Sequence, residues 1–592
     1  MGSVKEIFFL LLAAFFVVSD CSIETTTADR YIEHGGLNAG DADSTNHDAN
    51  QTHQVQRYKI AEFDFHTVAQ PFVISIWIVV ASAAKIGFHL NNKLSSWFPE
   101  SCLLILVGVI LGVILWAADV TRIVLDSHTF FLYLLPPIIL DAGYFMPNRA
   151  LFDNIGTILL FSVIGTLLNT LLIGFSLWGF SKSGGIGAFD LDLDLLHCLV
   201  FSSLLSAVDP VAVLAIFEEV QVNEILHIVV FGESLLNDGV TVVLYHLFEG
   251  LSHIGQENVI VLDVVYGVLS FFVVVGGGTA IGVLFGFLTA LVTRFTDHVR
   301  VIEPLVVFVM GYLSYLTAEM FHLSGILSCT FCAITMKKYV EANISQKSHT
   351  TIKYFLKMLA SVSETIIFMV LGISTVYATH RWETGFCLMS LIFCLVYRAA
   401  VVVFLTAIAN RFRLVRLSGV DQFIIAYGGL RGAIAFSLVA LLDIGLFPFQ
   451  PLFLTSTLLV IYFTVFVQGT TIKPLVGLFR IKRANKHKPT MNEQLHSRMI
   501  DHLMAGMEDI AGHHGNHNQR LLFENFNARY LKPMLIKRRN LRARGLSILN
   551  VYQKLNEKDA REMLSNGSFA DLTQLQNMSH SMADHLHYNN LQ

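Results

Sequence analysis

The stretch Phe231-Gly-Glu-Ser-Leu-Leu-Asn-Asp238 decides the fold. It places two carboxylates and an amide inside a run, residues 225–247, that is otherwise apolar enough to span a bilayer. Ionisable side chains at that depth are costly and indicate an ion pathway, although a single buried acid is about as often neutralised by its neighbours. Two further apolar runs carry Asp209-Pro210 and Arg398. Three such runs favour a transport protein.

The composition independently indicates a membrane protein. Of 592 residues, 54% are hydrophobic and 14% are charged, and the mean hydropathy is +0.59. A soluble chain of this length needs more charge to cover its surface. The net charge of −5 gives no indication of nucleic-acid binding. Cys329 and Cys332 have metal-ligand spacing but lack a second pair, so we expect them to pack inside a helix bundle, and we expect no cofactor and no metal beyond a transported cation.

The N-terminal region has the features of an exported segment. Residues 1–21 carry Lys5 before a short apolar run and resemble a cleaved signal peptide. Residues 22–65 are polar and contain the acceptor pattern Asn50-Gln-Thr52. We expect an extracellular, disordered segment with glycosylation at Asn50.

Residues 66–478 form the predicted transport domain, an all-α polytopic membrane fold, and residues 479–592 form a cytoplasmic helical tail. Thirteen spans are predicted, at 69–88, 101–118, 129–146, 154–180, 196–217, 225–249, 261–292, 303–318, 322–336, 355–378, 384–408, 421–443 and 450–477. An odd number of spans puts an extracellular N-terminus and a cytoplasmic C-terminus on opposite sides. The loops agree, because twelve Lys and Arg fall in loops predicted to be cytoplasmic or, for Lys357, at the cytoplasmic start of a span, and only Arg122, Lys182 and Arg381 fall in the others.

Two spans have helix-breaking residues at corresponding places. The fifth contains Asp209-Pro210, and the twelfth contains Tyr427-Gly428-Gly429-Leu430-Arg431-Gly432. Either one alone indicates a kinked helix. Their separation by seven spans instead predicts a 6+6 inverted repeat with two crossed discontinuous helices at the substrate site. Asp209 and Arg431 suit the opposite partial charges of half-helix ends, which gives both a structural role, and of the two Asp209 is better placed to line the cavity.

Helical geometry separates the polar residues of the sixth span. Glu233 and Asp238 are five residues apart, so their side chains project about 140° apart around the helix axis. Asp238 shares its face with Ser234, and we assign Asp238 to the ion and Asn237 to its orientation and ligation. Glu233 needs another partner, and Arg398 must itself be paired, so the two are predicted to form a structural ion pair.

Five motifs together resemble the animal sodium/proton exchangers, most closely the plasma-membrane, epithelial-type branch. They are Leu134-Leu-Pro-Pro-Ile-Ile-Leu-Asp-Ala-Gly-Tyr-Phe145, Ala207-Val-Asp-Pro-Val-Ala-Val213, the motif ending at Asp238, Ser363-Glu-Thr-Ile-Ile-Phe368 and Tyr427-Gly-Gly-Leu-Arg-Gly-Ala433. The match keeps order and spacing from about residue 66 to residue 560. The resemblance implies a thirteen-span homodimer in the plasma membrane, with recycling endosomes as a further location.

The resemblance also implies roles for individual residues. It implies ion binding at Asp238 with Asn237, a supporting Asp209, and the Glu233–Arg398 pair. Glu364 matches a carboxylate near the transport path, although it reads equally well as a buried, satisfied acid. A region that governs access and amiloride-class inhibition matches Phe130, Leu132, Tyr133, Pro136 and Pro137, with Tyr133 standing where more drug-sensitive relatives have Phe.

The tail carries an apolar stripe with a basic flank in residues 520–539. Leu522, Phe526 and Tyr530 recur every four residues, with Phe523 alongside. Such a stripe is typical of a helix that lies on the surface of a lipid membrane or binds in a groove of a partner protein. The resemblance implies that this helix binds a calcineurin B homologous protein, and Pro533 is expected to kink or split it.

These observations predict electroneutral Na+/H+ antiport by alternating access, which would serve pH and sodium homeostasis, and no enzyme activity. An endosomal K+(Na+)/H+ exchanger remains an alternative within the same family. A cation channel would need a continuous pore, which broken helices crossing at a carboxylate do not favour. Hydrolysis through Gly232-Glu-Ser234 lacks a convincing histidine base.

Overall fold

The computed structural model describes residues 75–76, 78–80, 82–88, 98–117, 127–183, 193–209, 217, 222–255, 258–296, 299–413, 415–479, 490–512, 516–537, 551–559 and 561. The predicted signal peptide (1–21), the predicted extracellular segment (22–65) with Asn50, and Pro210 lie outside these ranges.

Every regular element in the described ranges is a helix. After helical residues 75–76, 78–80 and 82–88, they are α4 (Glu100–Ala117), α5 (Ser127–Thr129), η1 (Phe130–Leu134), α6 (Leu135–Phe145), α7 (Asn148–Leu159), η2 (Leu160–Gly165), α8 (Thr166–Lys182), α9 (Leu195–Leu205), α11 (Glu224–Ile254), α12 (Val261–Arg294), η4 (Arg300–Ile302), α13 (Glu303–Met320), α14 (Gly325–Asn343), α15 (Gln346–Tyr377), α16 (Thr384–Phe412), α17 (Gly419–Tyr427), α18 (Ala433–Leu441), α19 (Gln450–Tyr462), η5 (Phe463–Gln468), α20 (Gly469–Leu478), α21 (Met491–Ile510), α22 (Asn516–Phe526), η6 (Asn527–Leu531) and α23 (Lys532–Leu535).

Eight helices in the described part of the chain are long and apolar enough to cross a membrane, counting α7–η2–α8 and α19–η5–α20 as one helix each. Each of the thirteen predicted spans overlaps a described helix. Helices α9, α17 and α18 are short because the fifth and twelfth spans are interrupted where the sequence places Asp209-Pro210 and the glycines. The chain is therefore a multi-pass helical membrane protein.

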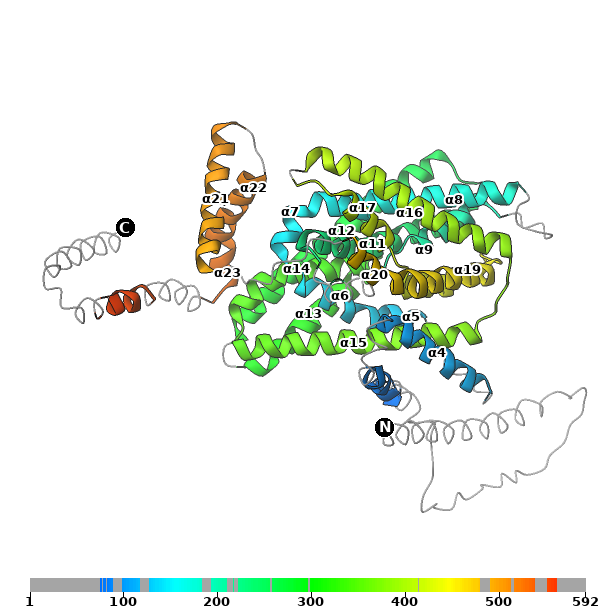
Figure 1. The fold of residues 1–592 in the computed structure, drawn as a ribbon, viewed down its shortest axis with the longest axis horizontal. Coiled ribbons are helices and arrows are strands. Elements are labelled where there is room, and N and C mark those ends of the chain that lie inside the picture. Colours follow the sequence, from blue (N-terminus) through cyan, green and yellow to red (C-terminus); the bar gives the residue numbers. More distant parts are fainter. Residues whose placement is uncertain are drawn as a thin grey trace, which may run out of the picture.

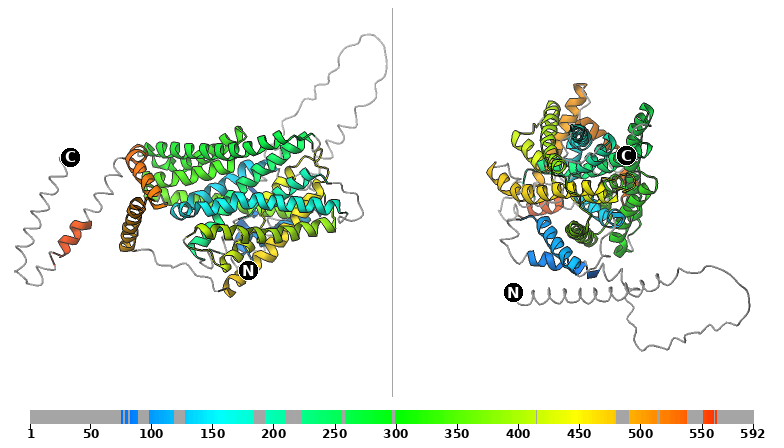
Figure 2. Two further views of the ribbon diagram at one scale, coloured as in Figure 1. Left: turned by 90° about the horizontal axis from the view of Figure 1, so that it is seen from above. Right: turned by 90° about the vertical axis from the view of Figure 1, so that its right-hand side faces the viewer.

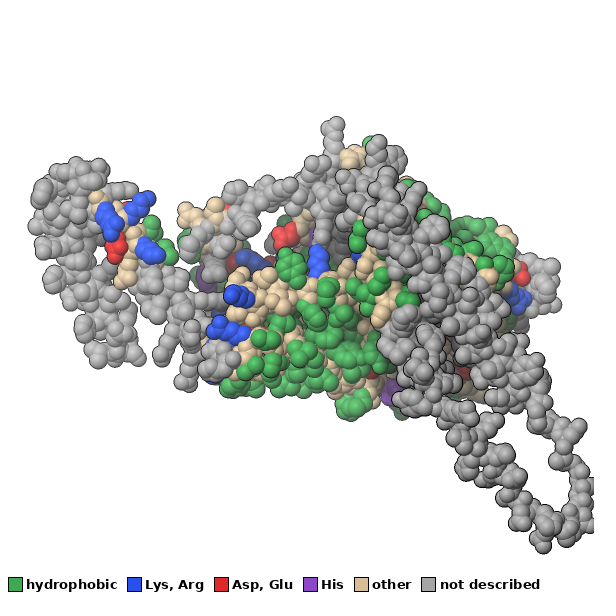
Figure 3. Space-filling view, turned by 90° about the horizontal axis from the view of Figure 1, so that it is seen from below, with side chains coloured by type: hydrophobic (Ala, Val, Ile, Leu, Met, Phe, Trp, Pro, Cys, Tyr) green, Lys and Arg blue, Asp and Glu red, His purple; other side chains and the backbone are tan. Residues whose placement is uncertain are grey.

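The long helices lie side by side along one direction, and the tail helices lie across one end of the bundle (Figures 1 and 2). Close packing depends on glycine at the α12–α14 contact. A Cβ on Gly278 would lie 2.6 Å from the carbonyl oxygen of Ser324, so only glycine permits this approach. In the view of Figure 3, hydrophobic side chains gather over the visible middle of the bundle, and several Lys and Arg side chains lie toward its left end.

The tail is attached to the bundle by specific contacts. Arg149 of α7 pairs with Asp501 of α21 at 2.9 Å. On α14, the hydroxyl of Tyr339 donates to Asn527 Oδ1 at 2.9 Å, and Asn343 Nδ2 donates to the carbonyl of Leu535 at 2.8 Å. These contacts put the beginning of α7 and the end of α14 at the same end of the bundle.

The chain is not split at Pro533. Helical residues run without a gap from Asn516 to Leu535. Pro533 directly follows the π-helical stretch η6, and a local departure from α-helical hydrogen bonding accommodates the missing N–H there. The helix ends two residues later.

Candidate functional site

The two interrupted spans meet at their breaks. Helix α9 ends at Leu205, and Ser206–Asp209 continue without regular helix, while α17 ends at Tyr427 and α18 begins at Ala433. The amide of Asp209 donates to the carbonyl of Leu430 at 2.8 Å. A Cβ on Gly432 would lie 2.5 Å from the Cβ of Asp209. The glycine-rich break thus lets the second chain segment approach Asp209 directly.

Arg431 caps the end of α9. Its side chain is 1% exposed, and one guanidinium nitrogen donates to the carbonyls of Ser206 and Ala207 at 2.9 and 3.0 Å. A helix C-terminus leaves carbonyl groups without intrahelical partners and carries partial negative charge. A buried cation from the other broken span therefore satisfies the end of this one.

Arg398 joins α16 to two other helices. Its guanidinium pairs with Glu233 of α11 at 2.5 Å, and both side chains are buried. A second nitrogen donates to the carbonyl of Ile425 at 3.1 Å, near the end of α17, where the amide of Gly428 donates to Ile424 at 2.7 Å. A Cβ on Gly429 would lie 2.8 Å from Arg398 Nε, so this glycine makes room for the guanidinium.

Asp238 and Ser234 lie one turn apart on α11 and are both buried, at 6% and 1% exposure. The hydroxyl of Ser234 donates to the carbonyl of Val230 at 3.0 Å, which leaves its oxygen lone pairs available. Asp238 Oδ1 is buried and accepts no hydrogen bond from the described part of the chain. A buried carboxylate oxygen without a donor is suited to bind a cation or a proton.

The amide of Asn237 is occupied by the protein. Its oxygen accepts from the amide of Val208 at 3.2 Å and from the hydroxyl of Thr241 at 3.3 Å. Its nitrogen donates to Thr166 Oγ1 at 2.6 Å. Both lone pairs of the amide oxygen are thus used, and this geometry favours orientation of the site over direct ligation by Asn237.

Glu364 lies on α15 near Lys85. Lys85 Nζ donates to Ser361 Oγ at 2.5 Å, one turn from Glu364, and pairs with Glu100 at 2.9 Å. The charges of Lys85 and Asp209 both act on Glu364. Glu364 is half-buried and lies within electrostatic reach of Asp209, at the break after α9.

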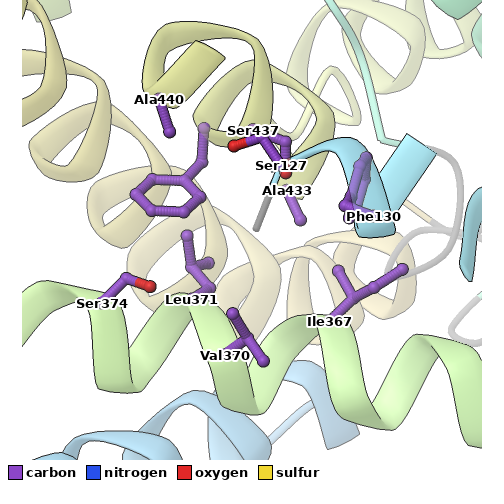
Figure 4. A pocket seen from close by; sticks show the side chains of 10 residues that line it. Ser127, Phe130, Ile367, Val370, Leu371, Ser374, Ala433, Ser437 and Ala440 are labelled. Atoms are coloured by element: carbon purple, nitrogen blue, oxygen red, sulfur yellow. The ribbon is translucent and has the colours of Figure 1, made fainter. Parts of the chain in front are cut away.

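A cavity of about 370 Å³ lies beside the second break. Figure 4 shows Phe130 of η1 and residues of α15, among them Ile367 and Ser374, facing Ala433 and Ser437 of α18. Pro136 and Pro137 are buried in α6, Leu132 is half-buried, and Tyr133 is 64% exposed. Of the predicted access residues, Phe130 is the one that lines the cavity.

The apolar stripe of α22 and η6 is open to solvent. Leu522, Phe523, Phe526 and Tyr530 are each more than half exposed, and Lys338 lies 5.9 Å from the Phe523 ring centroid. A second apolar face lies on α21 and was not predicted, although its apolar residues recur every three to four positions in the sequence. It consists of Leu495, Met499, Leu503, Met507 and Ile510, which are 54%, 53%, 57%, 61% and 90% exposed.

Across the residues that the structure describes, no group of three or more His, Cys, Asp or Glu side chains is arranged to hold a metal ion. Cys329 and Cys332 are buried in α14.

Comparison with known proteins places these features in context. The family described as "Sodium/hydrogen exchanger, transmembrane" matches residues 78–478. Sodium/hydrogen exchanger 3 of Homo sapiens is 52% identical over 86% of this chain and 61% of its own length. Sodium/hydrogen exchanger 2 of Oryctolagus cuniculus is 52% identical over 87% of this chain and 64% of its own length. The chain thus spans less than two thirds of the length of these curated relatives.

Among solved structures, the fold is similar to that of the sodium proton antiporter MjNhaP1 from Methanocaldococcus jannaschii at pH 8. The TM-score is 0.53 and the sequence identity 18%, over 69% of this chain and 98% of that one. This likeness concerns the fold alone.

Proposed function

The chain belongs to the sodium/hydrogen exchanger family, and we propose that it is an electroneutral antiporter that exports cytosolic H+ in exchange for extracellular Na+ by alternating access. The observation that carries this proposal is that the segments that follow α9 and α17 meet at the Asp209–Leu430 hydrogen bond near Asp238, whose buried Oδ1 accepts no hydrogen bond from the residues that the structure describes. Asp238 is the proposed ion carboxylate, with Ser234 and Asp209 in support and Asn237 orienting the site. Glu364 is proposed to lie on the transport path.

We propose thirteen membrane spans arranged as a 6+6 inverted repeat. The two breaks lie seven predicted spans apart. At the helix end before each break, a buried arginine donates a hydrogen bond to a backbone carbonyl. Arg431 reaches the carbonyls at the end of α9, and Arg398 reaches a carbonyl near the end of α17. This correspondence supports two related halves whose discontinuous helices cross at the site.

The proposed topology has an extracellular N-terminus and a cytoplasmic tail, in the plasma membrane. The tail contacts support it, because they join helix ends that the loop charges predict to be on one side. Besides α7 and α14, Arg294 at the end of α12 donates to the carbonyl of Met534, and Lys537 lies 3.9 Å from Glu303 at the start of α13. Residues 1–21 are proposed to be a signal peptide and Asn50 to be glycosylated.

We propose that the protein forms a homodimer. Most of the side chains in the first half of α12 are exposed and apolar, among them Val265, Leu269 and Phe272, each more than half exposed. Lipid can cover such a face, and a second copy can as well.

Proton-driven Na+ uptake in sealed vesicles tests the function. Vesicles that contain the purified chain are loaded at acidic pH and diluted into alkaline buffer that contains tracer Na+. We expect uptake that requires the outward H+ gradient and alkalinises the interior in step with Na+ entry. A cation channel would instead give uptake that follows the membrane potential without the H+ gradient, and that result would reject antiport.

We propose that a calcineurin B homologous protein covers the exposed apolar side chains of α22 together with those of α21. Replacing Phe526 or Met499 by Gln should each reduce co-purification of that partner by about tenfold, because each removes a large apolar anchor from a buried contact. Leu555→Gln is the matched control, since Leu555 is a 54% exposed leucine elsewhere in the tail. Unchanged co-purification in both variants would place the partner elsewhere.

A further inference from the structure

Two threonines of α8 hold the segment that precedes Asp209. Thr166 and Thr170 are four residues apart, lie on one face of α8, and are 1% and 0% exposed. Thr166 Oγ1 accepts from the amide of Asn237, whose oxygen accepts from the backbone of Val208. Thr170 Oγ1 donates directly to Ser206 Oγ at 3.0 Å. The two hydroxyls therefore reach two positions in the non-helical segment after α9, Ser206 directly and Val208 through Asn237.

Three residues make hydrogen bonds to the backbone of this break: Arg431, Leu430 and Asn237. Arg431 satisfies the carbonyls of Ser206 and Ala207, and Leu430 accepts from the amide of Asp209. The remaining link runs from Val208 through Asn237 to Thr166. The first two contacts come from the second broken span. The link through Asn237 of α11 to Thr166 of α8 depends on neither broken span for its support.

The polarity of the Thr166 link is determined by its neighbours. The hydroxyl hydrogen of Thr166 is donated to the carbonyl of Ser162 at 2.6 Å, so the hydroxyl oxygen is left as an acceptor. Asn237 must then direct its NH2 group to Thr166 and its oxygen to the N–H of Val208. Thr166 thus determines which way the Asn237 amide faces.

We propose that Thr166 is a positioning residue for cation binding, which acts through Asn237 on the backbone beside Asp209, and that Thr170 supports it. This inference rests on the proposed exchange function and deepens it. Without the Thr166 hydroxyl, the Asn237 NH2 group would be buried with no acceptor. The amide would turn to find one, release Val208, and let the carboxylate of Asp209 move away from the ion.

The test compares four purified variants in Na+-dependent proton efflux from proteoliposomes, with Na+ varied at fixed pH. Thr166→Val removes the hydroxyl and keeps the shape, and we expect it to raise the half-saturating Na+ concentration about tenfold, the scale of one unpaired buried donor. Thr166→Ser keeps the hydroxyl and should stay within about twofold of the parent. Thr170→Val should also stay within about threefold, because Ser206 still donates to the carbonyl of Ser202.

Thr406→Val is the matched control, since Thr406 is buried in α16 and donates to a carbonyl one turn back, outside the site. Equal half-saturating Na+ in Thr166→Val and Thr406→Val would overturn the inference while leaving antiport intact. Absence of exchange in the parent chain would reject the proposed function itself. Should Thr166→Val not mature, Thr166→Ala is measured in its place. Failure of both to mature, while Thr406→Val matures, would mean that the hydroxyl serves folding and would also overturn the inference.

Discussion

Replacing Asp238 by Asn is expected to abolish exchange while the protein still folds and reaches the membrane. The two side chains have nearly the same size, and among the described residues Asp238 Oδ1 accepts no hydrogen bond that the change would break. The carboxylate charge that attracts both Na+ and H+ is lost. Two unit charges about 4 Å apart at an effective dielectric constant of about 20 interact by about 4 kcal/mol, or about a thousandfold in affinity.

The measurement is Na+-driven recovery of internal pH after an acid load, normalised to the amount of protein at the surface. Glu224→Gln is the matched control, because Glu224 is an exposed acid in the first turn of the same helix, and it should transport like the parent chain. Substantial Na+-driven recovery in the Asp238→Asn protein would remove this carboxylate from the mechanism.

Removing either Glu233 or Arg398 is expected to prevent maturation. Both side chains are buried and paired at 2.5 Å, so each single change leaves an uncompensated charge inside the bundle. Breaking such a pair costs about 3–5 kcal/mol, a large part of the stability of a folded domain. We expect Glu233→Gln and Arg398→Gln to show little mature protein at the surface and a lower unfolding temperature.

Exchanging the two charges tests the pairing itself. Glu233→Arg combined with Arg398→Glu should recover part of the mature protein. Recovery is expected to be partial because Arg398 also donates to Ile425 near the end of α17, where a carboxylate is unfavourable. Glu100→Gln is the control, since the Lys85–Glu100 pair is partly exposed and such pairs contribute about 0–1 kcal/mol. A double variant no better than the worse single one would contradict the pairing.

Features with a local chemical signal could be predicted from the sequence. The breaks could be predicted because a proline or a cluster of glycines weakens a helix, and here each lies beside a charged residue within an apolar run. Successive glycines alone are not sufficient, since Gly276–Gly278 lie inside α12. The partner of Arg398 is readable because an intramembrane guanidinium needs an anion, and Glu233 faces away from Asp238. The extents of the long helices follow from their apolar runs, and α11 and α16 begin and end within a few residues of the prediction.

Contacts with backbone groups could not be predicted in the same way. The guanidinium of Arg431 binds carbonyl oxygens just beyond the end of α9, and every residue carries a carbonyl, so no residue type there marks the partner. The same holds for the Asn237 amide, whose bond to Val208 depends on tertiary packing. Thr166 has no sequence signal that separates it from the other threonines of the chain. The apolar face of α21 could have been predicted from the spacing of its apolar residues. The segment as a whole is polar, however, so it does not stand out as an apolar run.

In the proposed cycle a single carboxylate, Asp238, carries either Na+ or H+, so the same charge crosses the membrane in both directions. The most direct test is Na+-dependent pH change in proteoliposomes while K+ and valinomycin clamp the membrane potential at a series of values. We predict that both the initial rate and the final pH gradient are independent of the imposed potential. A rate or a final pH gradient that shifts with potential would show that a second group, such as Asp209, changes charge during the cycle, and it would contradict one-for-one exchange at Asp238.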